Sequence, residues 1–396
     1  MNRNYNKYIF FIISLLIVNQ VLSQASAYHS VVFPYDLNIY QIMTSGGTIS
    51  AKPDPNSSIQ LNPAGLAFID NPVFFFNHSY HTVSYNIDYD HIDNRKSSDN
   101  SDHNPGLFSV ILPFIIAEKK IVISAGLQKI QSPEVEIWDE IYPDQERYAY
   151  HSRTGAVSKT DFTISGQPVK GLGVGLGLSK WSGNWYWYDQ TYYETTISGK
   201  YNYTGTSFNL ALLYLWKQVK IGLTFYSPFQ LMSSSTINAN LWWTYNVPHN
   251  IKQKFDGAIR SGLLYHLNPK WSIGIDYRWQ NKITVENIHK DSLLTSYNST
   301  YSESHKISLT LERNFHWKSI ELPIFIDYQL NLLPKTPAND YRHYQRIEIN
   351  GKNNDQHSVF AGINVLYKSY GLYLAAGWDT GSVYIDNRNR MTPPWS

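Results

Sequence analysis

The 396-residue sequence contains no cysteine, which excludes disulfide bonds and every metal or redox site that needs a thiolate. It also lacks a charge excess of either sign, because 33 Lys and Arg stand against 31 Asp and Glu. A nucleic-acid partner usually requires a clear basic excess, so we expect none. The HExxH spacing of zinc proteases and the GxSxG spacing of serine hydrolases are both missing.

Histidine spacing gives no metal-binding pattern either. His78 and His81, the pair in HSYH, would point to opposite faces of a strand and could not share an ion. The Asp and Glu residues are scattered, so they fit charges on the walls or loops of the fold better than an acid–base pair. We therefore expect no catalytic residues, no metal and no cofactor, and we predict that the protein is not an enzyme.

Long apolar runs are absent after the N-terminus. Arg3 and Lys7 precede the apolar run Ile9–Val18, which is shorter than the roughly 20 residues of a membrane helix. Small residues follow it. This order is typical of a secretory signal peptide, with cleavage after Ser23 or after Ala27. We predict that residues 1–27 are the signal peptide, and that the remaining chain is secreted, periplasmic or an outer-membrane barrel.

Aromatic residues are abundant, with 31 Tyr and 12 Trp. Their rings are apolar but carry a polar O–H or N–H group, so they gather where a protein crosses a membrane–water boundary. A tyrosine-rich soluble β protein or a carbohydrate binder would have the same composition. Composition alone therefore leaves the membrane interpretation and the soluble interpretation open.

The stretch Trp271–Gln280, WSIGIDYRWQ, alternates apolar and polar residues with a period of two. Its apolar face could pack in the core of a soluble sheet or face lipid. Trp271 and Trp279 would lie about 27 Å apart along a strand at roughly 3.4 Å per residue. Tilting reduces this to roughly 20 Å across a membrane, close to the roughly 25 Å apolar band of outer-membrane barrels. The lipid-facing interpretation then places Asp276 and Arg278 inside the barrel.

Similar alternation recurs from Pro72 onward, for example in Ser207–Trp216 and Ser358–Tyr367. Polar clusters such as residues 91–106 read as loops between the strands. Strands of about ten residues, joined alternately by short turns and long polar loops, are typical of outer-membrane barrels. We predict an all-β fold, a transmembrane antiparallel β-barrel over residues 72–387. The chain ends in MTPPWS, whose prolines break a strand, so residues 388–396 are predicted to be a C-terminal tail.

Residues 28–71 differ from the rest, because they are rich in Pro, Asn, Ser and Gly and show no sustained period. They still carry many apolar side chains, and a disordered tail would carry fewer.

In Gly171–Leu178, GLGVGLGL, the larger residues would face outward and the glycines inward. The spacing does not fit a nucleotide-binding loop. Inward glycines suit a lumen filled close to the wall, and residues 28–71 are the candidate filler.

The stretch Ser45–Phe68, SGGTISAKPDPNSSIQLNPAGLAF, resembles the start of the FadL/TodX family of outer-membrane transport proteins. In that family a small-residue segment leads to an Asn-Pro-Ala motif within an N-terminal hatch that plugs a barrel. Here the motif is Asn62-Pro63-Ala64, followed by Gly65. Leu213–Gln230 and Lys254–Trp279 resemble the family more weakly. The resemblance implies a monomeric barrel of about 14 strands, with residues 28–71 as an N-terminal hatch or plug in the lumen.

The resemblance also implies a function: passive uptake of hydrophobic small molecules, fatty-acid-like or aromatic, across the outer membrane of a Gram-negative-type bacterium. Outer-membrane lipid would surround the barrel. Candidate pocket residues are the apolar side chains of the hatch, namely Phe33, Tyr40, Met43 and Phe68.

Candidate gating residues are Asn62, Pro63, Ala64 and Gly65. Pro63 fixes its own φ and restricts Asn62, whose amide can satisfy backbone groups of an irregular segment. The same four residues could instead form an ordinary structural turn, and the sequence does not separate the two interpretations.

Two other functions fit parts of the pattern. The motif also occurs in PorV/PorQ-like outer-membrane barrels, which would bind a protein partner in a secretion system rather than a small molecule. An extracellular, soluble all-β binding protein is the third interpretation.

Overall fold

A computed structural model describes residues 20–22, 50–89, 92–131, 135–142, 147–190, 196–240, 244–289, 297–332, 355–367 and 370–380. These residues form one sheet of 19 strand segments. Two short helical elements, α3 (Pro55–Gln60) and the 3-10 helix η1 (Pro63–Phe68), precede its long strands. Among the described residues, no helix is long and apolar enough to cross a membrane.

The strand segments follow one another along the chain with short interruptions. They are β1 (Gln20–Leu22), β2 (Val73–Tyr89), β3 (Ile92–Ile116), β4 (Lys119–Gln131), β5 (Val135–Tyr142), β6 (Arg147–Val169), β7 (Leu172–Gln190), β8 (Thr196–Trp216), β9 (Val219–Tyr226), β10 (Phe229–Asn240), β11 (Thr244–Phe255), β12 (Ala258–Asn268), β13 (Trp271–Gln280), β14 (Ile283–His289), β15 (Tyr297–Tyr301), β16 (Ser304–Trp317), β17 (Ile320–Leu332), β18 (Asp355–Tyr367) and β19 (Tyr370–Thr380).

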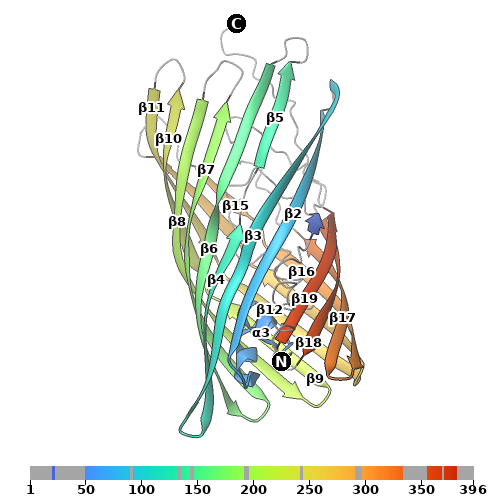
Figure 1. The fold of residues 1–396 in the computed structure, drawn as a ribbon. Helices are drawn as coiled ribbons and strands as arrows, with labels where there is room; N and C mark the ends of the chain where they lie inside the picture. Colours follow the sequence, from blue (N-terminus) through green and yellow to red (C-terminus); the bar gives the residue numbers. More distant parts are fainter. Residues whose placement is uncertain are drawn as a thin grey trace, which may run out of the picture.

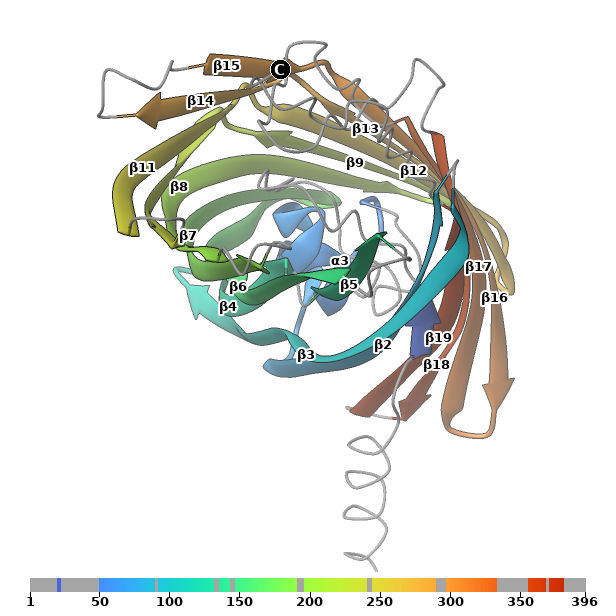
Figure 2. The same ribbon diagram turned by 90° about the horizontal axis from the view of Figure 1, so that it is seen from above.

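The sheet curls around a central axis into a tall barrel (Figures 1 and 2). From β2 to β19 each strand pairs antiparallel with its neighbours. β1 lies between the two ends and pairs parallel with both, so that Val21 is opposite Gly377 and His81. β1 belongs to the residues predicted as the signal peptide; the rest of residues 1–27 lies outside the described residues. The predicted antiparallel β-barrel is confirmed.

The prediction that residues 91–106 form a polar loop is wrong for residues 92–106; residue 91 lies outside the described residues. β3 is 25 residues long and pairs with β2 from Ile92 onward. β6, with 23 residues, is also longer than the roughly ten residues expected. Backbone pairing extends these strands although their side chains are polar there. A polar composition therefore does not end a strand of this sheet.

Two-residue turns close one end of the barrel, which we call the turn end. They join β3 to β4, β6 to β7, β8 to β9, β12 to β13 and β16 to β17. Ala117, Glu118, Lys217 and Lys318 have φ between 48° and 63° there, and Gly171 has φ 84°. Such turns match the right-handed twist of paired strands. At the opposite end β17 stops at Leu332 and β18 begins at Asp355, so the chain between these strands is far longer than a two-residue turn. Outer-membrane barrels share this asymmetry between short turns and long connections.

Apolar side chains of the sheet point outward and polar side chains point inward, which is the reverse of the arrangement around the core of a soluble protein. In β13, Ile273 and Ile275 point outward and are 46% and 44% exposed, whereas Asp276 and Arg278 point inward and are 2% exposed. The other long strands repeat this pattern with exposed Phe, Leu and Ile, among them Phe162, Leu176, Leu210, Leu223, Leu309 and Ile326. The interpretation in which the apolar face of Trp271–Gln280 packs in a soluble core is therefore wrong.

Four neighbouring strands of the barrel wall are each divided into two segments by a two-residue interruption, and the four interruptions lie side by side. The interruptions lie at Ser227-Pro228, Asp256-Gly257, Asn281-Lys282 and Ser302-Glu303, between β9 and β10, β11 and β12, β13 and β14, and β15 and β16. Asn281 N–H donates to Gly257 O at 3.0 Å across two of them. Gln280 and Ile283 both point inward, so the alternation shifts by one residue. Each pair of segments runs once from one end of the barrel to the other and counts as one strand. The number of strands in the wall is then close to the expected 14.

Candidate functional site

Residues 50–69, which we call the lumen segment, lie inside the ring of strands (Figure 2). Asn62 caps η1 from an extended conformation, with φ −149° and ψ 92°, and Pro63 occupies the first helical position. Asn62 Oδ1 accepts the Ala64 N–H at 3.1 Å. Asn is a preferred capping residue, and Pro is pre-organised for the first turn of a helix. The local sequence therefore specifies this turn.

The Asn62 side chain also joins the turn to its surroundings. Its Nδ2 donates to Ser50 O and to Leu212 O of β8, both at 2.9 Å. Asn62 is 1% exposed. One buried amide thus connects three pieces of backbone: η1, the start of the lumen segment and the barrel wall.

Hydroxyl groups of the wall satisfy carbonyls of the lumen segment. Ser165 Oγ of β6 donates to Pro63 O at 2.6 Å. Thr224 Oγ1 and Tyr226 OH of β9 donate to Leu61 O at 2.9 and 3.1 Å. An irregular segment buried in a lumen cannot pair its backbone in a sheet, so these side chains supply partners that it would otherwise lack.

The inward glycines of β7 leave the space that the turn occupies. A Cβ atom on Gly173 would lie 2.4 Å from Ala64 O, and one on Gly175 would lie 2.6 Å from Ala64 N. Gly173, Gly175 and Gly177 are buried, while Leu176 and Leu178 are about half exposed. The predicted orientation of GLGVGLGL is therefore present. Gly177 has a different neighbour, because its space is taken by the Asn209 side chain.

Ion pairs anchor the start of the lumen segment. Asp276 Oδ2 of β13 accepts the Ser50 N–H at 2.7 Å, and its Oδ1 accepts Arg260 Nε of β12 at 2.6 Å. The Arg260 and Asp276 side chains are only 3% and 2% exposed. Lys52 Nζ lies 2.5 Å from Glu312 Oε2 of β16. A buried charge is costly without its partner, so the Arg260–Asp276 pair fixes where Ser50 can dock.

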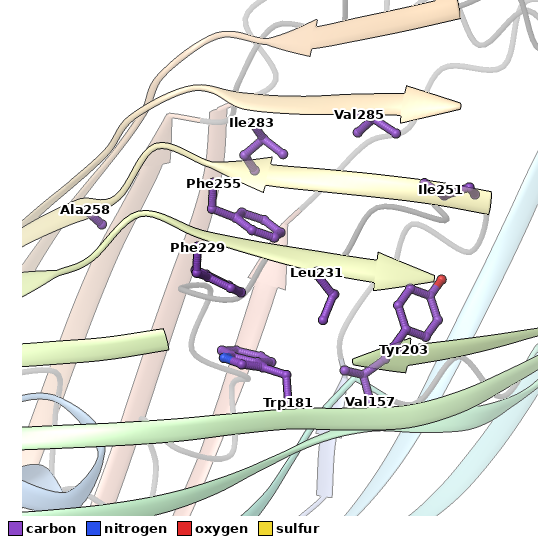
Figure 3. Close-up of a cluster of buried hydrophobic side chains, with 10 residues drawn as sticks. All are labelled: Val157, Trp181, Tyr203, Phe229, Leu231, Ile251, Phe255, Ala258, Ile283 and Val285. Carbon is purple, nitrogen blue, oxygen red and sulfur yellow. The ribbon is translucent and has the colours of Figure 1, made fainter. Parts of the chain in front are cut away.

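A second inner surface is apolar. Its members, which we call the apolar wall cluster, are Val157, Trp181, Tyr203, Phe229, Leu231, Ile251, Phe255, Ala258, Ile283 and Val285 (Figure 3). The ring of Phe229 stacks on Trp181 with centroids 5.4 Å apart and on Phe255 with centroids 4.5 Å apart, both at 15°. The cluster thus places a row of stacked rings on the inner wall, and its members are between 1% and 7% exposed.

The lumen segment and the apolar wall cluster lie at different heights. Gly173 and Gly175, which contact Ala64, follow directly after the β6–β7 turn, whereas Trp181 lies further along β7. Phe229 and Ile283 begin the segments beyond the interruptions in the wall. The lumen segment is therefore nearer the turn end, and the cluster lies between it and the end with the long connections.

The structure brings Asn62, Pro63, Ala64 and Gly65 together in one buried turn, although a gating role for them stays a prediction. Phe68 is half-buried and packs with Ala51, Ala64, Ala211, Leu213 and Leu264, apart from the apolar wall cluster. The other predicted pocket residues, Phe33, Tyr40 and Met43, lie outside the described residues.

The sequence analysis missed the apolar wall cluster, because it assigned apolar positions of each strand to the outer face. One signal was available. Pro228, Gly257 and the Asn281-Lys282 pair each stand one or two residues before an apolar residue that now points inward. Turn-forming residues inside a long alternating stretch indicate a shift of the alternation.

No protein-family model and no curated protein matches the sequence. Solved structures do. The toluene transporter TodX of Pseudomonas putida matches with a TM-score of 0.50 and 13% identity, over 89% of this chain and 91% of TodX. A FadL homologue of Pseudomonas aeruginosa matches with a TM-score of 0.52 and 10% identity, over 84% and 86% of the two chains. Since identities are this low, the likeness lies in the fold: the chain has a FadL/TodX-like β-barrel fold.

Proposed function

We propose that the protein is an outer-membrane barrel for passive uptake of hydrophobic small molecules, fatty-acid-like or aromatic. The observation that carries this proposal is the combination of an apolar outer face with an aromatic cluster on the inner wall. The outer face suits lipid contact, and the inner cluster suits an apolar solute. The fold of a toluene transporter supports the same solute class. We propose that the protein acts as a monomer, because the described strands β2 to β19 of one chain curl into a ring.

The proposed path runs along the barrel axis. Solute enters from the end with the long connections and binds the apolar wall cluster. The lumen segment closes the way to the turn end, as a hatch. Opening requires the turn at Asn62-Pro63-Ala64 to leave the wall, and the Asn62 amide holds that turn closed. The PorV/PorQ-like alternative would place function in the long connections, most of which lie outside the described residues.

Replacing Phe229 with Ala should weaken uptake of an aromatic solute. Phe229 is the central ring of the stacked row between Trp181 and Phe255. An aromatic pair contributes about 0.5–1.5 kcal/mol beyond area burial, so losing one such contact between the ring and the solute should slow uptake about two- to twelvefold. The measurement is entry of a fluorescent aromatic probe into vesicles containing the full chain. Phe225→Ala, four residues earlier on the outer face, is the matched control. If vesicles containing the wild-type protein take up the probe no faster than protein-free vesicles, the proposed function is refuted.

Replacing Asn62 with Ala should make uptake leaky while the barrel still forms. The substitution removes hydrogen bonds to Ala64 N, Ser50 O and Leu212 O, each contributing about 1 kcal/mol. The closed arrangement should lose about 2–3 kcal/mol, so uptake at low probe concentration should rise at least about tenfold. Asn364→Ala is the control, because Asn364 is buried on the inner wall and its Oδ1 has no partner among the described residues. Equal uptake by wild type and Asn62→Ala would show that Asn62-Pro63-Ala64 is an ordinary structural turn without a gating role.

A further inference from the structure

Four successive turns at the turn end each present an exposed lysine. The turns join β6 to β7, β8 to β9, β12 to β13 and β16 to β17, and these strands are neighbours around the barrel. The lysines are Lys170, Lys217, Lys270 and Lys318. We call this arc, together with Arg313, the basic rim.

Hydrogen bonds between adjacent turns hold the basic rim in place. Gly171 O accepts the Leu215 N–H at 2.7 Å. Gln218 O accepts the His266 N–H at 2.9 Å, and Lys270 O accepts the Asn314 N–H at 2.7 Å. Successive turns are two strands apart, or about 10 Å at the usual strand spacing. The lysines therefore extend from a rigid backbone at regular intervals around the turn end.

Aromatic rings accompany the basic groups. Lys217 Nζ lies 5.7 Å from the Trp216 ring centroid, and Lys318 Nζ lies 5.8 Å from that of Trp317. The Arg313 guanidinium lies 4.9 Å from the Trp271 ring. Tryptophan marks the membrane–water interface, and basic side chains beside it reach the headgroup level. Exposed apolar residues of the outer face follow directly along the same strands.

Acidic groups do not balance the basic rim. Within the four turns and the two residues on either side of each, Glu321 is the one acidic residue. Each exposed lysine near an anionic surface contributes about 1 kcal/mol of attraction. A protein partner would also be attracted by the charge, but the rim adjoins the outward apolar residues of the same strands, an order that matches the layered structure of a bilayer.

We propose that the basic rim binds the phosphate groups of anionic phospholipids in the membrane leaflet at the turn end. This inference rests on the proposed function in one respect, namely that the barrel spans a membrane. Binding would fix the depth of the barrel and enrich anionic lipid around it. The tryptophans set the level of the interface, and the lysines and Arg313 contact the headgroups.

The test compares quenching of tryptophan fluorescence by brominated phosphatidylglycerol and by brominated phosphatidylcholine, with the full chain in mixed vesicles. Wild type should favour phosphatidylglycerol. Lys217→Gln/Lys318→Gln should lower this preference by about fivefold per lysine removed. Lys180→Gln/Lys200→Gln, which removes the same charge away from the turn end, should leave it unchanged. Salt should weaken the wild-type preference, because exposed charges are screened.

Two outcomes would overturn the inference: no preference in wild type, or the same preference in wild type and the Lys217/Lys318 variant. Neither outcome contradicts the proposed function, which is measured separately by probe uptake in vesicles of pure phosphatidylcholine. A chain that enters those vesicles and takes up probe, yet shows no lipid preference, refutes the basic rim alone. Heat-modifiable migration on a gel confirms that each variant has folded.

Discussion

Replacing Asp276 with Ala is expected to destabilise the barrel by about 3–5 kcal/mol, because removing one partner of a buried ion pair leaves an uncompensated charge. Arg260 is 3% exposed and would lose its carboxylate partner, and the Ser50 N–H would lose its acceptor. Equilibrium urea unfolding of the protein in lipid vesicles measures the effect. The loss of the Ser50 contact should also make the lumen segment easier to cleave by protease.

Two further variants show whether the effect comes from the ion pair. Asp256→Ala removes a carboxylate from an exposed position at the interruption between β11 and β12, and should leave unfolding nearly unchanged. Arg260→Met/Asp276→Leu removes both charges and should recover most of the stability, as apolar replacements of buried pairs do. If Asp276→Ala unfolds at the same urea concentration as wild type, the pair does not hold the wall and the lumen segment together.

Replacing Ile275 with Arg should destabilise the membrane-inserted barrel by about 2–4 kcal/mol, the cost of a basic side chain at the middle of a barrel's lipid face. Ile275 lies in the middle of β13, opposite the outward residues Leu263 and Leu309, and is 44% exposed. A soluble protein would tolerate Arg at so exposed a position. Unfolding in vesicles therefore separates the two environments.

The control for Ile275→Arg is the same substitution at an outward-facing position nearer the end of the barrel. Leu267 also points outward and is 47% exposed, but it lies beside the β12–β13 turn. Arg at this position should cost only about 0–1 kcal/mol, because the side chain reaches the interface. Equal effects at the two positions would contradict a lipid-facing band centred on Ile275.

Much of the wall could be predicted from local patterns. The period-two alternation of Trp271–Gln280 gives its inner and outer faces, because one face of a strand in such a barrel must be apolar. The inward glycines Gly173 and Gly175 predicted a filled lumen, because a missing Cβ allows another backbone to approach. These inferences needed only a strand and its side-chain periodicity.

The apolar wall cluster could not be predicted in that way. Phe229 and Leu231 alternate with Gln230 and Met232, and nothing within that stretch tells which side faces the lumen. The side is decided by pairing with β8 and β11, whose residues are distant in sequence, and by the shift at Ser227-Pro228. Only long-range register carries this information. The Arg260–Asp276 pair likewise depends on the pairing of β12 with β13.

The aligned interruptions in the wall have an evolutionary consequence. On the turn-end side of them, the inner residues of β12 and β13 are committed to holding the lumen segment, as with Arg260 and Asp276. On the other side, the inner residues of β10, β11 and β14 pack mainly with one another. If this cluster binds solute as proposed, substitutions there change solute preference without disturbing the contacts of the lumen segment. Under the proposed function, the fold places the contacts that close the lumen and the surface that meets solute on separate residues, so changes to the latter alone would give related barrels new substrates.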